Sequence, residues 1–91
     1  MSNDLEKQIA FNWQGDLDDD CGAYHDNLLL RAEQMDTDRW WWAVNVRNES
    51  GRYDEIASSN DEGAVIPKTG SEARAVAEEV ARRYLGTRKH D

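Results

Sequence analysis

The most regular hydrophobic pattern in the chain lies between Arg39 and Arg47. Trp and Val favour the pleated backbone of a strand, and nine residues is an ordinary strand length. Side chains alternate across a strand, so one face here would be wholly apolar and the other would turn polar toward its end. The first face holds Trp40, Trp42, Val44 and Val46, and the second holds Trp41, Ala43, Asn45 and Arg47. We predict an inner strand of an antiparallel sheet that is covered on its apolar face.

The segments before this strand have weaker patterns. Leu5, Ile9 and Trp13 recur at helical spacing, but Ile9, Phe11 and Trp13 also alternate as in a strand. Because Ile, Phe and Trp favour strands, we predict a strand for Ile9–Gln14. The next eight residues, Gly15–Gly22, place four carboxylates between two glycines and predict an acidic loop.

The stretch Ala23–Met35 fits two structures. It is rich in helix formers, but Tyr24, Leu28, Leu30 and Ala32 also alternate with Leu29, Arg31 and Glu33. We predict a strand, because the tryptophan-rich strand needs a neighbour on each side. The polar triplet Asp36-Thr37-Asp38 would then be the turn between the two strands.

A third strand and a connection follow. Asn48–Gly51 predicts a hairpin turn in which Gly51 has a positive φ. The polar segment Arg52–Ser59 predicts an edge strand with Ile56 as its main core residue. In the connection Asn60–Gly70 we expect Val65-Ile66 to enter the core and Pro67 to fix the chain.

The clearest helix spans Gly70–Leu85. Thr69 and Glu72 have the spacing of a capping box, and Gly86 is a typical helix C-cap. Its outer face would carry the pairs Glu78–Arg82 and Glu79–Arg83. The apolar stripe would consist of Ala73, Val76, Ala77, Val80 and Tyr84.

These elements predict one α+β domain over residues 1–91: a three- or four-stranded antiparallel meander with a C-terminal helix packed on one face. Its parts would be an acidic N-terminal segment and loop (1–22), a strand meander (23–59), a connection (60–70), the helix (70–85) and a frayed tail (86–91).

The distribution of charge bears on partners. The 91-residue chain has a formal net charge of −8. Residues 1–38 contain ten acids and two bases, whereas the acids and bases of residues 39–91 balance. This asymmetry argues against direct nucleic-acid binding, which needs Lys and Arg to neutralise phosphates. The polar start and the lack of a long apolar run predict a cytoplasmic protein without membrane contact.

Two groups of residues could carry chemistry. Asp16, Asp18 and Asp20 have the spacing that opens a calcium-binding loop, but Cys21 and Asn27 replace the glycine and the bidentate Glu that complete one. These aspartates are therefore weak metal candidates at most. Cys21 is the only cysteine, so no internal disulfide forms, and the aspartates before it should raise its pKa rather than activate it. We predict no cofactor and no catalytic residues.

The residues from Trp42 to Gly51, the segment Ile56-Ala57-Ser58-Ser59 and the closing helix together resemble the YegP-like β-β-β-α modules of bacteria. Those modules also show an aromatic strand, a glycine turn, a strand with an apolar-Ala-Ser pattern and a helix. The resemblance covers about half of the chain and implies the fold, but it implies no activity and no site residues. The chain also resembles small acidic bacterial and prophage proteins.

The function that best fits these features is a non-enzymatic protein-interaction module whose partner has a basic or mixed surface. Aromatic residues are enriched at binding hot spots, so Trp41 and Trp13 would be its anchors, beside the carboxylates of Asp18, Asp19 and Asp20. Two alternatives are an acidic nucleic-acid mimic that inhibits a nucleic-acid-binding protein, and a weak divalent-metal-binding domain.

Overall fold

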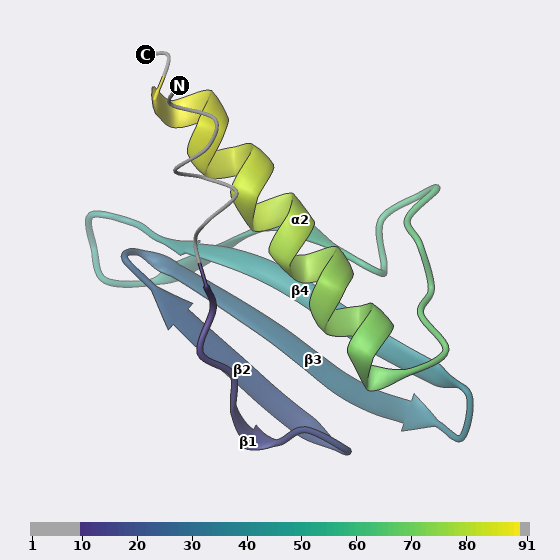
Figure 1. Cartoon of the computed structure of the whole chain (residues 1–91). Helices are drawn as coiled ribbons and strands as arrows, with labels where there is room; N and C mark the ends of the chain where they lie inside the picture. The colour runs from purple at the N-terminus through teal and green to yellow at the C-terminus, as the bar shows by residue number, and fades with distance from the viewer. Residues whose placement is uncertain (1–9, 90–91) are drawn as a thin grey trace.

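The computed structural model describes residues 10–89 and the side chains of residues 10–86. Within this range the fold is a five-stranded antiparallel meander with the strand order β1-β2-β3-β4-β5 and one helix, α2, across one face (Figure 1). The strands are β1 (Gln14–Asp16), β2 (Asp20–His25), β3 (Leu28–Asp36), β4 (Arg39–Arg47) and β5 (Tyr53–Ser58), and the helix is α2 (Gly70–Lys89). The predicted α+β class and the single helix on one face are confirmed, with more strands than expected.

The tryptophan-rich segment forms β4 with the predicted bounds and lies between β3 and β5. Trp40, Trp42 and Val44 are buried against α2, as the alternation of side chains predicts. The helix contributes Ala73, Ala77 and Ala81, each fully buried. These small side chains let the helix axis lie close to the large indole rings of β4.

The extra strands come from a turn that the sequence reading missed. Ala23–Met35 is not one strand, because the chain reverses at Asp26 and Asn27 between β2 and β3. Asp26 has a φ of 52°, a left-handed conformation that Asp tolerates better than most residues. As a result Tyr24 does not share a face with Leu28 and Leu30. It pairs with Leu29 on the face away from the helix.

The N-terminal predictions also need correction. Gly15–Gly22 is not a loop but the greater part of the β1–β2 hairpin, whose turn is residues 17–19. The strand predicted for Ile9–Gln14 is wrong for residues 10–13, which adopt no regular structure, and only Gln14 belongs to β1; Ile9 lies outside the described residues.

On the C-terminal side, the turn at Asn48–Gly51 is confirmed, with a φ of 87° at Gly51. Val65 and Ile66 do not enter the core: each is 58% exposed, and Pro67 is buried in their place.

The helix does not end before Gly86 but continues to Lys89, so the predicted C-cap and the frayed tail through residue 89 are wrong. His90 and Asp91 lie outside the described residues.

The helix start is close to the predicted capping box. The Thr69 hydroxyl accepts a hydrogen bond from the Glu72 backbone N–H at 3.1 Å. The Glu72 carboxylate accepts from the N–H of Lys68, rather than from that of Thr69. The first contact satisfies a backbone donor of the first turn, where no intrahelical partner exists, and the second fixes the residue before the cap to the helix.

Candidate functional site

Two acidic turns that are distant in sequence meet at one end of the molecule. The β1–β2 turn and the β3–β4 turn lie at the same end of the meander, where α2 also begins (Figure 1). The backbone N–H of Gln34 donates to the carbonyl of Asp19 at 2.6 Å and ties the first turn to the end of β3. We call the exposed carboxylates of these turns the acidic end; they are Asp16, Asp18, Asp19, Asp20, Asp36 and Asp38.

The missed turn at Asp26 and Asn27 is the reason for this arrangement. If Ala23–Met35 were a single strand, the acidic segment around Asp18 and the turn at Thr37 would lie at opposite ends of the sheet. One more reversal of the chain brings them together. The signal that could have revealed the turn is the pair Asp26-Asn27, two turn formers between two alternating segments.

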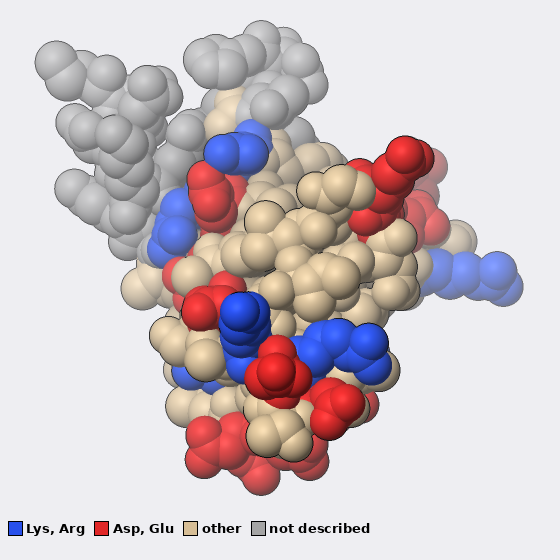
Figure 2. Space-filling model, turned by 90° about the vertical axis from the view of Figure 1, so that its right-hand side faces the viewer, with Lys and Arg blue, Asp and Glu red and all other residues tan. Residues whose placement is uncertain are grey.

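Carboxylates at the acidic end are held near one another despite like charge. Asp16 and Asp20 are cross-strand partners in the β1–β2 register. Like charges directly opposite in a sheet are destabilising. The Arg31 guanidinium relieves part of this repulsion, at 3.8 Å from Asp20. Basic side chains are also present at this end, so its surface is strongly but not purely acidic (Figure 2).

Trp41 lies close to the acidic end, on the face of the sheet away from α2, which we call the open face. Asp20, Glu33 and Trp41 are successive partners across β2, β3 and β4, so they form one row. Trp41 is half-buried, and the Arg31 guanidinium lies over its ring, 5.5 Å from the centroid. Of the described residues before β1, Phe11 and Trp13 do not cover this face, because they pack against the core on the helix side.

Trp13 is not part of this group. Its ring is half-buried against the core, and its indole N–H donates to the Glu78 carboxylate at 2.8 Å. Glu78 also pairs with Arg82 at 3.0 Å, and the Arg82 guanidinium lies over the ring of Phe11. These contacts hold Phe11 and Trp13 against the helix. Of the five predicted partner-binding residues, the structure brings together Trp41, Asp18, Asp19 and Asp20, and it gives Trp13 a structural role.

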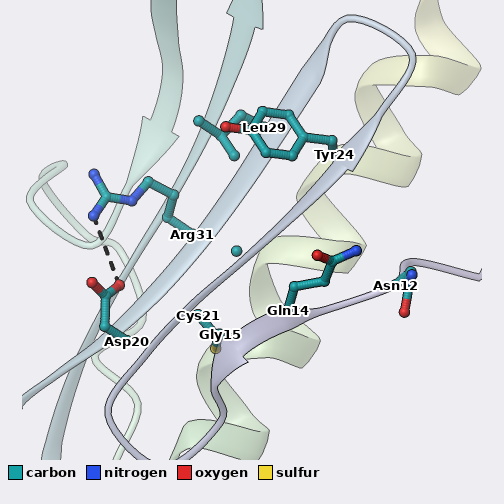
Figure 3. Close-up of a pocket in the computed structure, with 9 residues that line it drawn as sticks. Asn12, Gln14, Gly15, Asp20, Cys21, Tyr24, Leu29 and Arg31 are labelled. Carbon is teal, nitrogen blue, oxygen red and sulfur yellow. Dashed lines mark ion pairs between the residues drawn. The ribbon is translucent and has the colours of Figure 1, made fainter.

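A shallow hollow of about 540 Å³ lies on the open face (Figure 3). Gly22 leaves space between its neighbours because it has no side chain. Tyr24 and Leu29 form an apolar side of the hollow, and the Arg31–Asp20 ion pair forms a charged side (Figure 3). Asn12 and Gln14 contribute side-chain amides. The only carboxylate among the lining residues is that of Asp20, which lies 3.8 Å from the Arg31 guanidinium and is 54% exposed.

Cys21 is also among the residues that line the hollow, but it is buried. Burial raises the pKa of the Cys21 thiol above its ordinary value, although contact with Arg74 opposes the rise. The thiol group lies 3.7 Å from the carbonyl of Ala32, within reach as a hydrogen-bond donor. A buried, protonated thiol is a poor nucleophile and a poor metal ligand.

The carboxylates of the calcium-like motif do not converge. Asp16 accepts a hydrogen bond from the Asp18 backbone N–H at 2.9 Å, and Asp20 faces Arg31. Across the described part of the chain, no three His, Cys, Asp or Glu side chains are grouped so that they could hold a metal ion. The geometry therefore gives no support to a metal site at Asp16, Asp18 and Asp20.

Comparison with protein-family models, with curated proteins and with solved structures finds no match to this chain. The YegP-like pattern therefore stays a prediction. Among residues 10–89, no helix is both long and apolar enough to cross a bilayer.

Proposed function

We propose that this protein is a non-enzymatic, cytoplasmic interaction module that binds a basic or mixed surface of another protein through its acidic end. The observation that carries the proposal is the meeting of two sequence-distant acidic turns, with the Asp20–Glu33–Trp41 row beside them. Carboxylates gathered on one surface steer an oppositely charged partner, and a nearby aromatic ring supplies contact area.

Among the described residues, the acidic end offers a partner more than the hollow or the Cys21 thiol does. The hollow on the face away from the helix is shallow, and its Asp20 carboxylate lies 3.8 Å from the Arg31 guanidinium. The thiol of Cys21 is buried and its pKa is raised. By contrast, the acidic end is built from side chains that reach into solvent, where a protein partner can contact them.

A charge-matched pair of double variants tests the proposal. In the first, Asp18→Asn and Asp38→Asn remove one exposed carboxylate from each acidic turn. In the control, Glu49→Gln and Glu55→Gln remove two exposed carboxylates from the opposite half of the sheet, so both variants carry the same net charge. Binding of a lysine-rich peptide is measured by calorimetry at low and moderate salt.

We expect the acidic-end variant to bind roughly two- to thirtyfold more weakly, because it loses two exposed ion pairs that contribute about 0.2–1 kcal/mol each. The control should keep most of the wild-type affinity, and salt should reduce the difference. Equal losses in the two variants would mean that net charge alone matters, and the acidic end would lose its assigned role.

A further inference from the structure

The connection between β5 and α2 presents two aliphatic side chains on a fixed backbone. Val65 and Ile66 are each 58% exposed. The backbone around them is held by three hydrogen bonds. The Ala64 N–H donates to the Asp61 carbonyl at 3.0 Å, the Trp42 indole N–H donates to the Val65 carbonyl at 3.0 Å, and the Trp40 N–H donates to the Pro67 carbonyl at 2.9 Å.

The fold does not need these two side chains to be apolar. The contacts that hold the connection use backbone carbonyls, and Pro67 supplies the buried ring. A polar pair at positions 65 and 66 would satisfy the same hydrogen bonds and would be better solvated. A preorganised apolar pair in solvent is what a binding anchor requires, because little conformational entropy is lost when a partner covers it.

Val65 and Ile66 lie beside the acidic end. They flank the first half of β4, whose start belongs to the β3–β4 turn. Six large hydrophobic side chains are exposed among the described residues, and four of them are at or beside this end: Leu17, Met35, Val65 and Ile66. Figure 2 faces this side of the molecule and shows a broad uncharged area, with acidic and basic side chains intermingled below it and acidic side chains at its upper right.

Resting on the function proposed above, we infer that Val65 and Ile66 are the apolar anchor for a basic amphipathic helix of the partner protein. Such a helix has an apolar stripe that would cover the pair, and its flanking Lys and Arg side chains would reach the carboxylates on either side. Asp61 and Glu62, both exposed, lie on the chain just before the pair, although the Asp61 carboxylate also accepts a hydrogen bond from the Ser58 N–H. The exposed Lys68 follows the pair, and the more numerous carboxylates of the acidic end lie beyond it.

Two other occupants fit the structure less well. An added strand would need free backbone groups along Arg39–Trp42, but the connection already occupies this edge. The Trp40 N–H donates to Pro67, and the Trp42 carbonyl accepts from the Ser59 N–H at 3.0 Å. A second copy of the chain would bring a net charge of −8 and its own acidic end against this one, and like-charge repulsion disfavours that contact.

The test uses two synthetic peptides of identical Leu and Lys composition and about five helical turns. One arranges its leucines as a helical stripe, and the other scatters them around the helix. Each is titrated into the wild-type protein, into a Val65→Ser, Ile66→Ser double variant and into a Tyr53→Ser control. Tyr53 is exposed at the start of β5, away from the acidic end, and thermal melts confirm that each variant is folded.

We expect the wild-type protein to prefer the striped peptide, and the double variant to lose about tenfold in affinity for it, as the burial of two half-exposed aliphatic side chains implies. The Tyr53→Ser control should bind the striped peptide as tightly as the wild-type protein does. The affinity for the scattered peptide should be nearly the same in all three proteins. The proposed role of Val65 and Ile66 would be overturned if the wild-type protein bound the two peptides equally well, or if the double variant kept the wild-type affinity for the striped peptide.

The two proposals fail in different ways. If the Asp18→Asn, Asp38→Asn variant loses affinity but the Val65→Ser, Ile66→Ser variant does not, the acidic end binds a basic surface without this anchor. If the Asp18→Asn, Asp38→Asn variant also binds as the wild type does, the proposed function itself is wrong.

Discussion

At the residue scale, three consecutive tryptophans have separate roles because strand geometry points them in alternate directions. Trp40 and Trp42 are buried under α2, and the indole N–H of Trp42 holds the connection at Val65. Trp41 faces the other way and lies under Arg31. Alternation alone predicts the first two roles. The partner of Trp41 depends on the strand register, which the sequence does not show.

Trp13 provides a test of a single hydrogen bond. Trp13→Phe keeps an aromatic ring in the core but removes the N–H that Glu78 accepts. We expect the free energy of unfolding to fall by about 1–2 kcal/mol, because the acceptor is a charged, largely buried group. Urea denaturation measures the change. Trp41→Phe, at another half-buried indole, is the matched control and should be less affected; equal losses would show that ring size, and not the hydrogen bond, matters.

At the element scale, the strands and the helix that have a strong pattern were predictable, and the elements that depend on short turns were not. β4 has the predicted bounds, and α2 starts where the capping residues indicate. The extension of α2 past Gly86 was missed because a glycine can either end a helix or be tolerated inside one. The separation of β2 from β3 was not predicted, because the alternating apolar residues on the two sides of Asp26-Asn27 look like one continuous strand pattern.

The junction between α2 and β4 gives an element-scale prediction. A Cβ atom at Gly70 would lie 2.9 Å from the ring of Trp40 and 3.0 Å from the carbonyl of Leu17. The ring is buried and the carbonyl is backbone, so neither can move freely. We therefore expect Gly70→Ala to destabilise the fold by about 1–3 kcal/mol, the usual range for overpacking, even though Ala is the better helix former.

The change is measured by urea denaturation, with Ser71→Ala as the control at the neighbouring exposed position. This control should be neutral or slightly stabilising. A Gly70→Ala variant as stable as the wild type would show that the helix start is less tightly packed against Trp40 than the structure indicates.

At the scale of the whole molecule, the sequence predicts the sign of the net charge but not how the charged side chains are distributed over the surface. The excess of acids in residues 1–38 is evident from the sequence. Which turns share an end of the sheet depends on how often the chain reverses, so one missed turn separates Asp18 from Asp38 in the predicted fold. The exposure of Val65 and Ile66 was likewise hidden, because the buried ring of Pro67 takes the place predicted for them.

The most direct test of the central claim is a map of amide chemical-shift changes as the striped Leu/Lys peptide is titrated into the labelled protein. We predict saturable changes centred on residues 16–20, 36–38 and 64–67, the segments of the acidic end and of the apolar pair. Changes centred instead on the opposite turns, residues 26–27 and 48–52, or no saturable change at all, would contradict the account.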